Sequence, residues 1–198
     1  MTPSCTGIIL AGGLNSRFHG KNKAFIQIDG KRIIDHVYEI FSELFDRIII
    51  VTNDPIQYLE WDVHIVSDIF SCRSSLTGIH AGLFFSTTPY SFFTACDSPF
   101  FQKDLLQTIL EHIDDATDII VPETSAGLEP LCAVYSRNCL KAAEHQLINK
   151  NFKIAHFYDK VRVKKIPESV LRKKDPELIS FLNINTPEDL KQIQTSIP

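Results

Sequence analysis

The stretch Gly7-Ile8-Ile9-Leu10-Ala11-Gly12-Gly13, followed by Arg17 and Lys23, decides the fold of this chain. Its apolar first half predicts a buried strand, and the small residues after it predict a loop at that strand's carboxyl end. Small residues let backbone N–H groups approach a ligand closely, and two nearby cations suit a polyphosphate. The stretch therefore indicates a nucleotide-binding loop. A strand-to-loop turn with a solvated basic patch stays open as the alternative.

Two well-known phosphate-binding loops do not match this stretch. A P-loop requires Ser or Thr directly after its lysine, whereas Lys23 is followed by Ala24. A dinucleotide-binding loop requires a third glycine where this chain has Arg17. The loop therefore belongs to neither of these two classes.

Length and composition predict one cytoplasmic domain over residues 1–198. The chain is 44% hydrophobic and 22% charged, as in soluble globular proteins, and its net charge of −4 argues against nucleic-acid or membrane-surface partners. No run approaches the roughly 20 apolar residues that span a bilayer, and the first residues lack a signal-peptide pattern. The cysteines show no Cys-x-x-Cys pair, which argues against a disulfide framework or a zinc cluster: Cys5, Cys72, Cys96, Cys132 and Cys139.

Strand and helix patterns alternate along the chain. Apolar residues recur at helical spacing over 33–45, and a continuous β-branched run follows at 47–51. Such alternation predicts a three-layer, Rossmann-like α/β fold with a mainly parallel sheet and helices on both faces. The polar segment 168–177 reads as a solvated excursion. Further strands are predicted at 63–66, 91–95, 118–121, 131–135 and 161–166, and further helices at 76–85, 104–113, 137–148 and 187–195.

Polar residues follow several of the predicted strands and should meet at one edge of the sheet. Ligands of parallel α/β sheets bind beyond the carboxyl ends of the strands. Asp97 ends an apolar strand and is fixed by Pro99, so its carboxylate is well placed to hold a hard cation such as Mg²⁺. A helix cap or turn residue is the alternative for Asp97. Asp68 suits a ribose or base edge, although aspartates after strands are ordinary turn formers, and Asn53-Asp54-Pro55 would make a good turn without any ligand.

The remaining reactive residue types do not form a recognisable catalytic pattern. The seven histidines lack metal-ligand spacing and are interpreted as structural or exposed. Cys96 has no evident base partner and is interpreted as a packing residue. Glu129-Pro130 either lines the pocket or begins a strand.

The chain resembles the molybdenum cofactor guanylyltransferases. The resemblance covers about residues 6–191 in order, and it rests on Leu10–Gly13 with Arg17 and Lys23, and on three further motifs. The motif at residues 183–190 is more specific to this family than the first loop, which many nucleotidyltransferases share. The further motifs are Asp97-Ser98-Pro99, Glu129-Pro130-Leu131-Cys132-Ala133 and Asn183-Ile184-Asn185-Thr186-Pro187-Glu188-Asp189-Leu190.

The resemblance implies a nucleotide-diphospho-sugar transferase fold and transfer of GMP from GTP to the terminal phosphate of Mo-molybdopterin, with release of pyrophosphate. It implies Mg²⁺ as the cofactor, and molybdoenzymes or their chaperones as further partners. Residue roles follow by position. Leu10, Ala11, Gly12, Gly13, Asn53 and Asp68 would contact the nucleotide, Arg17 and Lys23 would act on its phosphates, Asp97 would bind the metal, and Asn183 and Asn185 would contact the acceptor or the metal.

The chain departs from the family at the segment Ser74-Ser75-Leu76-Thr77-Gly78, where the family commonly has Gly-Pro-Leu-Ala-Gly. The sister cytidylyltransferases carry Ser-Leu at this place, but they usually have a different first loop. A cytidylyltransferase acting on molybdopterin and a sugar-phosphate nucleotidyltransferase are therefore alternatives. A non-catalytic nucleotide-binding domain is the alternative from another class of protein.

Overall fold

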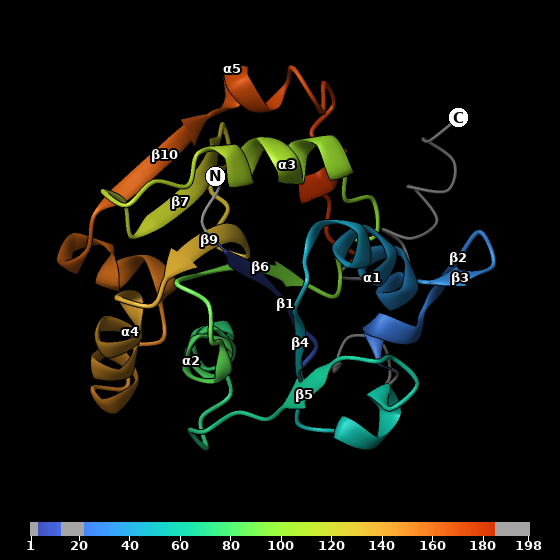
Figure 1. Cartoon of the computed structure of the whole chain (residues 1–198), viewed down its shortest axis with the longest axis horizontal. Coiled ribbons are helices and arrows are strands. Elements are labelled where there is room, and N and C mark those ends of the chain that lie inside the picture. Colours follow the sequence, from blue (N-terminus) through green and yellow to red (C-terminus); the bar gives the residue numbers. More distant parts are fainter. Residues whose placement is uncertain (1–3, 13–21, 185–198) are drawn as a thin grey trace.

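A central eight-stranded sheet organises the computed structural model, which describes residues 4–12 and 22–184 (Figure 1). The strand order is β10-β7-β9-β6-β1-β4-β5, and β8 pairs with β7 at the side of this path. A separate hairpin of two short strands, β2 and β3, precedes the first long helix. The strands span Cys5–Leu10 (β1), Gln27–Ile28 (β2), Lys31–Arg32 (β3), Ile48–Val51 (β4), His64–Val66 (β5), Tyr90–Ala95 (β6), Ile119–Thr124 (β7), Gly127–Leu128 (β8), Cys132–Ser136 (β9) and Val163–Pro167 (β10).

Most of the sheet is parallel, as the alternation of strands and helices predicts. β1 lies parallel to β4 and β6, β4 to β5, and β7 to β10. β9 is the exception in the middle of the sheet, because it runs antiparallel to both β6 and β7. The start of β9 therefore meets the carboxyl ends of its neighbours, which brings the Glu129-Pro130 segment to that edge.

Helices cover both faces of the sheet, which confirms the three-layer prediction (Figure 1). α1 (Ile33–Leu44) and α3 (Lys103–Glu111) contribute to the core on one face, and α2 (Ser75–Phe85) and α4 (Cys139–Ile148) to the core on the other. α5 spans Glu168–Leu171. Short 3-10 helices occur at Lys23–Phe25, Pro55–Tyr58, Ile154–Lys160 and Ile179–Phe181.

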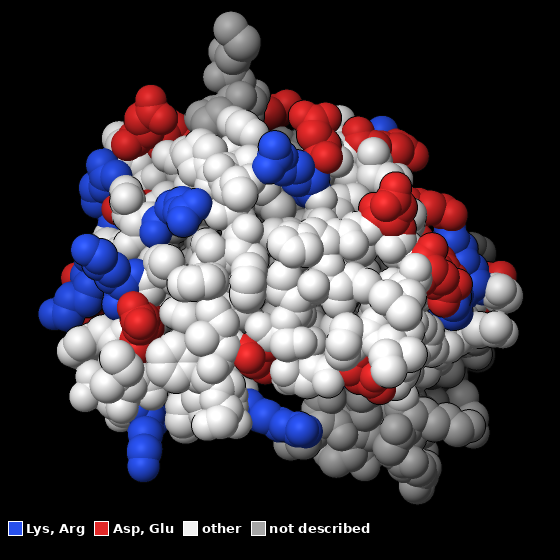
Figure 2. All heavy atoms as spheres, turned by 60° about the horizontal axis from the view of Figure 1, so that its bottom comes forward, with Lys and Arg blue, Asp and Glu red and all other residues white. Residues whose placement is uncertain are grey.

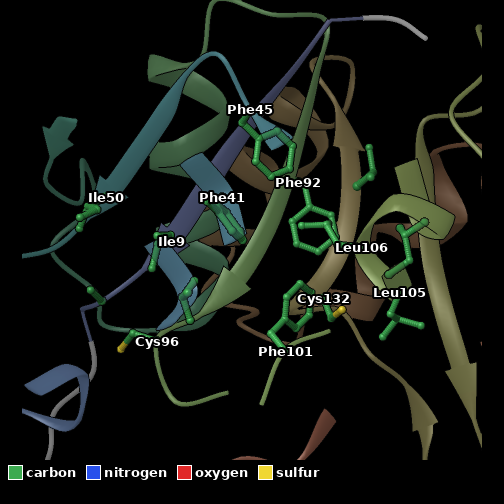
Figure 3. Packing of buried hydrophobic residues seen from close by; sticks show 14 of the residues in the cluster. Ile9, Phe41, Phe45, Ile50, Phe92, Cys96, Phe101, Leu105, Leu106 and Cys132 are labelled. Atoms are coloured by element: carbon green, nitrogen blue, oxygen red, sulfur yellow. The ribbon is translucent and has the colours of Figure 1, made fainter. Parts of the chain in front are cut away.

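Aromatic rings fill the core under α1 (Figure 3). The ring centroids of Phe41 and Phe45 lie 5.0 Å apart, and those of Phe41 and Phe92 lie 5.9 Å apart in an edge-on arrangement. A Cβ on Gly7 would come within 2.6 Å of the rings of Phe41, in α1, and Phe45, directly after it, so only glycine allows β1 to pass beneath them. The first strand is thereby held tightly against α1, and its carboxyl end has a fixed position.

The face under α2 is packed just as closely. A Cβ on Gly82 would lie 2.6 Å from the ring of Phe93 and 2.9 Å from Ile8. Gly82 therefore lets α2 approach the centre of the sheet.

Figure 2 shows one face of the molecular surface, on which Lys and Arg are interspersed with Asp and Glu around a broad area without charged side chains.

The prediction for the polar segment 168–177 is wrong in part. Its first residues form α5, Leu171 is fully buried, and Asp175 is only 3% exposed. The Asp175 carboxylate accepts hydrogen bonds from the backbone N–H groups of Ile179 and Ser180, at 3.0 and 2.8 Å. The sequence pattern does not indicate that these two residues are buried, because they stand in a run of charged residues and the helix is too short to show a periodic pattern. The predicted helix 187–195 lies outside the described residues.

Candidate active site

The carboxyl ends of β1, β4, β5 and β6 meet at one edge, as the strand-end rule predicts. Leu10 pairs with Val51 on one side and with Ala95 on the other, and Val51 pairs with Val66. The residues that follow these strands, Ala11-Gly12, Asn53, Asp68 and Asp97, therefore emerge side by side. The predicted residues Gly13, Arg17 and Asn185 lie outside the described part of the chain.

Lys23 and Asp97 form the charged centre of this edge. The Lys23 Nζ atom donates to Oδ2 of Asp97 at 3.4 Å, and the two side chains are 15% and 24% exposed. Both groups are largely removed from water yet still open to a ligand on one side. Their attraction is therefore stronger than that of a pair on the open surface.

Asn22 fixes the start of the 3-10 helix that carries Lys23. Its side-chain Oδ1 accepts a hydrogen bond from the backbone N–H of Ala24 at 3.1 Å, while its Nδ2 donates to the Tyr58 hydroxyl at 2.9 Å. The Tyr58 hydroxyl in turn reaches the carbonyl oxygen of Ala11 at 3.5 Å. Tyr58 is fully buried, so this chain of contacts links Lys23 to the end of β1.

The sequence argument missed Asn22 and Tyr58. An Asn directly before a short helix is a capping signal, so Asn22 was open to prediction from its residue type alone. Tyr58 lies 36 residues further along the chain and carries no local signal of this kind. Only the packing of the 3-10 helix Pro55–Tyr58 brings its hydroxyl to the loop.

Asn53 and Asp68 lie together at the ends of β4 and β5. Asn53 Nδ2 donates to Asp68 Oδ2 at 2.8 Å, and a Cβ on Gly12 would lie 3.7 Å from the same Nδ2 atom. Burial raises the pKa of the Asp68 carboxyl, and the Asn53 hydrogen bond and the charge of Arg73 oppose that rise. These groups border a cavity of about 330 Å³ beside the first loop, lined by Asn53, Asp68, Ile69, Phe70, Ser71, Cys72 and Arg73.

The segment Ser74–Gly78, which differs from the common family sequence, forms the cap and first turn of α2. Ser74 Oγ accepts from the Thr77 backbone N–H at 3.1 Å and lies 2.9 Å from the Thr77 hydroxyl, which is also 3.4 Å from Cys72 Sγ. Ser74 is thus a helix cap of the usual kind. A Cβ on Gly78 would lie 3.1 Å from Leu10, so α2 packs directly against the start of the first loop.

Asn183 lies beside the Asp97 turn. Ser98 Oγ donates to Asn183 Oδ1 at 2.7 Å, and the Ile184 backbone N–H donates to the Asp97 carbonyl at 2.9 Å. Asn183 is exposed, whereas Ile184 is fully buried. The predicted acceptor-binding segment is therefore attached to the predicted metal-binding turn.

The residues at this edge suit Mg²⁺ bound mainly by oxygen atoms from outside the protein. Over residues 4–12 and 22–184, no three His, Cys, Asp or Glu side chains gather in a way that could hold a metal ion. Mg²⁺ typically keeps several waters and takes one or two carboxylates together with substrate phosphates. The partly exposed Asp97 carboxylate, with the Lys23 ammonium beside it, fits that mode of binding.

Three further predictions concern Cys96, the histidines and Glu129. Cys96 is 9% exposed, and burial raises the pKa of its thiol to about 12, which supports its interpretation as a packing residue. His80 is buried between aromatic rings of Phe70 and Phe84, and burial lowers its pKa. Glu129 is half-buried and accepts a hydrogen bond from Thr124 at 3.3 Å, and burial raises the pKa of its carboxyl.

Residues 7–161 match the family model described as the MobA-like NTP transferase domain. The fold and this match define a nucleotidyltransferase, and the chain belongs to the MobA-like NTP transferase family. It is 46% identical to the molybdenum cofactor guanylyltransferase of Desulfosudis oleivorans, over 97% of this chain and 95% of that protein. It is 39% identical to a probable molybdenum cofactor guanylyltransferase of Natranaerobius thermophilus, over 97% and 96% of the two chains.

Solved structures support the same assignment of fold. Molybdopterin-guanine dinucleotide biosynthesis protein A from Archaeoglobus fulgidus aligns with a TM-score of 0.83 and 30% identity, over 96% of this chain and 97% of that one. A nucleotidyl transferase from Methanothermobacter thermautotroptrophicus, at 18% identity and a TM-score of 0.73, shows the fold alone. The expected nucleotide-diphospho-sugar transferase fold is confirmed. In the part of the chain that the structure describes, no helix is both long and apolar enough to cross a membrane.

Proposed function

We propose that this chain transfers GMP from GTP to the terminal phosphate of Mo-molybdopterin and releases pyrophosphate. The observation that carries the proposal is the Lys23–Asp97 pair, at 3.4 Å, on the ligand-binding edge of a MobA-like fold. The pair offers a cation for phosphate oxygens and a carboxylate for a metal ion in adjacent positions. The choice of GTP as nucleotide and molybdopterin as acceptor follows the names of the relatives described above.

The reaction exchanges one phosphoric anhydride bond for another. An oxygen of the acceptor phosphate attacks the α-phosphorus of GTP, and the bond from that phosphorus to the bridging oxygen of the β-phosphate breaks. A phosphate monoester has its second pKa at about 6, so the attacking group is already largely a dianion at neutral pH. No side chain is then needed as a general base, in accord with the absence of a His–Asp or Cys–His arrangement among the proposed site residues.

The main obstacle is repulsion between the acceptor dianion and the triphosphate. Lys23, together with Arg17, would lower this repulsion by pairing with phosphate oxygens. Asp97 would hold Mg²⁺, which when bound supplies positive charge at the phosphates and fixes their geometry. The Asn22–Tyr58 contacts keep Lys23 in place, so its charge is oriented before the substrates arrive.

The two halves of the edge would hold the two substrates. Leu10 to Gly13, with Asn53 and Asp68 beside the 330 Å³ cavity, would contact the nucleotide. Asn183, which is hydrogen-bonded to Ser98 next to Asp97, would contact the acceptor, and so would Asn185, which lies outside the described residues. Guanine is the proposed base because the relatives are guanylyltransferases, although Ser74–Gly78 departs from the common family segment.

Pyrophosphate release tests the proposal when it is measured with purified protein, Mg²⁺ and molybdopterin carrying molybdenum. GTP should support turnover at least about tenfold better than CTP, and omission of the acceptor should abolish it. Higher activity with CTP would instead indicate a cytidylyltransferase. Nucleotide binding in a thermal-shift assay without any pyrophosphate release would favour the non-catalytic alternative. The cytoplasm is the proposed compartment, and molybdoenzymes or their chaperones are the proposed recipients of the product.

A further inference from the structure

The turn after β6 carries two functional contacts on neighbouring residues. Asp97 reaches Lys23 through its carboxylate, while the next residue, Ser98, donates from Oγ to Asn183 Oδ1 at 2.7 Å. Ser98 is only 8% exposed, so the donor end of this part-buried hydrogen bond is shielded from competing water. The bond joins residues 85 positions apart in sequence.

The segment that carries Asn183 is anchored next to this bond. The Ile184 backbone N–H donates to the Asp97 carbonyl at 2.9 Å, and the fully buried Ile184 side chain clusters with Ile28 and Ile33. The backbone of Asn183 is therefore held independently of Ser98. What the Ser98 hydroxyl adds is control over the orientation of the exposed Asn183 side chain.

A carboxamide presents a carbonyl oxygen on one side and an NH₂ group on the other. Because the Ser98 hydroxyl binds the oxygen, the NH₂ group of Asn183 points away from the turn. The Asn183 side chain is exposed, so this group is open to a ligand at the edge of the sheet. An NH₂ donor in that position suits a phosphate oxygen.

We propose that Ser98 is a positioning residue, which holds the Asn183 carboxamide with its NH₂ group directed at the phosphate of the acceptor. This inference rests on the proposed function. It links the two substrates to one turn, because Asp97 serves the nucleotide side and Ser98 serves the acceptor side through Asn183. Loss of the Ser98 hydroxyl should therefore affect the acceptor and leave the nucleotide unchanged.

Steady-state kinetics of Ser98→Ala, with GTP and molybdopterin varied separately, tests the inference. One lost neutral hydrogen bond corresponds to about a 3- to 10-fold effect. The KM for the acceptor should rise by that factor, and the KM for GTP should stay within twofold of the wild-type value. Ser98→Thr, which keeps a hydroxyl, should restore most of the acceptor affinity.

Ser91→Ala is the matched control. Ser91 lies on β6 itself, in the half of the strand away from the proposed site. It is 1% exposed, and its hydroxyl donates to Ser86 Oγ at 3.0 Å. This variant removes an equally buried hydroxyl, so any general loss of packing should appear in it too. Its acceptor KM should equal that of the wild-type protein.

A double-mutant cycle separates positioning from a merely structural role. Ser98→Ala combined with Asn183→Ala should raise the acceptor KM no more than Asn183→Ala does alone, since Ser98 acts through that side chain. Effects that multiply independently would overturn the inference, as would an equal rise in the KM for GTP.

Asn183→Asp keeps the test decisive if Ser98→Ala fails to fold. The aspartate retains an oxygen for the Ser98 hydroxyl but replaces the NH₂ donor with a negatively charged oxygen. The acceptor KM should then rise by at least tenfold with the thermal midpoint nearly unchanged, and an unchanged acceptor KM would contradict the inference. Wild-type protein without turnover would refute the proposed function itself, whereas normal turnover in all variants would refute only the role of Ser98.

Discussion

The Lys23 ammonium lies 3.4 Å from the Asp97 carboxylate, although 74 residues separate them in the sequence. Each side chain comes from a different element: Lys23 from a 3-10 helix after the first loop, and Asp97 from the turn after β6. In this arrangement the two charges stabilise each other, and in the proposed reaction substrate phosphates and a metal ion would replace them as partners.

Replacing Lys23 by Ala should lower the rate of pyrophosphate release at least about tenfold. One lost charge-assisted contact corresponds to about 1.5–3 kcal/mol, and each 1.4 kcal/mol is a factor of ten. Lys103→Ala is the control, because Lys103 pairs with Glu43 in an exposed ion pair. Near-normal kcat/KM in the Lys23 variant would exclude the phosphate-binding role.

Replacing Asp97 by Asn should abolish Mg²⁺-dependent turnover and leave the fold intact. The amide keeps the size of the side chain, but it has no charge with which to hold a divalent cation. The measurement is turnover against Mg²⁺ concentration. Glu43→Gln, which alters the exposed Lys103–Glu43 ion pair, is the control. A variant that saturates with Mg²⁺ at the wild-type concentration would show that the metal is held elsewhere.

Removing the Asn22 side chain should impair both stability and catalysis. Asn22→Ala deletes the cap of the 3-10 helix and the bond to the Tyr58 hydroxyl, at a cost of about 1 kcal/mol in the free energy of unfolding. Turnover should also fall, because Lys23 loses its fixed position. Urea unfolding and steady-state kinetics measure the two effects.

Tyr58→Phe is the companion variant for Asn22→Ala. It removes the hydroxyl but keeps the ring, whose centroid lies 5.2 Å from that of Phe25. Stability should fall by about 0.5–1.5 kcal/mol, the scale of one hydrogen bond, because the Asn22 amide is only partly buried and keeps its bond to Gln57 at 3.2 Å. Equal turnover in both variants and in the wild type would mean that these contacts do not position Lys23.

Asp118 should make the fold sensitive to acid. Hydrogen bonds from Arg162 above all, and from Asn138 and Ser136, hold the pKa of the Asp118 carboxyl well below its usual range. A folded-state pKa below the unfolded value means that this contribution is fully present above the unfolded pKa, at about 4. It is lost as pH falls below 4 through the folded-state value.

Asp118→Asn tests this pH dependence in urea unfolding at pH 7 and pH 3. The variant should be less stable at pH 7 by about 1–3 kcal/mol, on the scale of hydrogen bonds to a charged group. The difference between wild type and variant should narrow at pH 3, because the Asp118 carboxyl of the unfolded chain is then largely protonated while that of the folded protein is still charged. Glu123→Gln, which alters an exposed pair with Lys165, should show little difference at either pH. A constant difference at both pH values would show that the charge of Asp118 is not the cause.

Much of the fold was predictable from local patterns. The spacing of Ile33, Val37 and Phe41 predicts α1, and each of them is fully buried in the structure. The continuous run at 47–51 predicts a strand buried on both faces, and it lies between β1 and β5. Such periodicity follows directly from which side chains must avoid water.

The candidate site was predictable only as a set of positions on one edge. The strand-end rule places Asn53, Asp68 and Asp97 near the first loop because parallel strands end together. It says nothing about which side chains touch. The bonds from Asn53 to Asp68 and from Ser98 to Asn183 depend on side-chain directions that are set by packing.

The sequence by itself determined the alternation of strands and helices and which polar residues follow the strands at the carboxyl edge. Only the tertiary structure decided that β9 runs antiparallel, that Tyr58 links the first loop to Asn22, and that Ser98 holds Asn183. The reason is physical. Periodicity and turn chemistry act over a few neighbouring residues, whereas contacts 36 to 85 residues apart arise from the pairing and packing of whole elements.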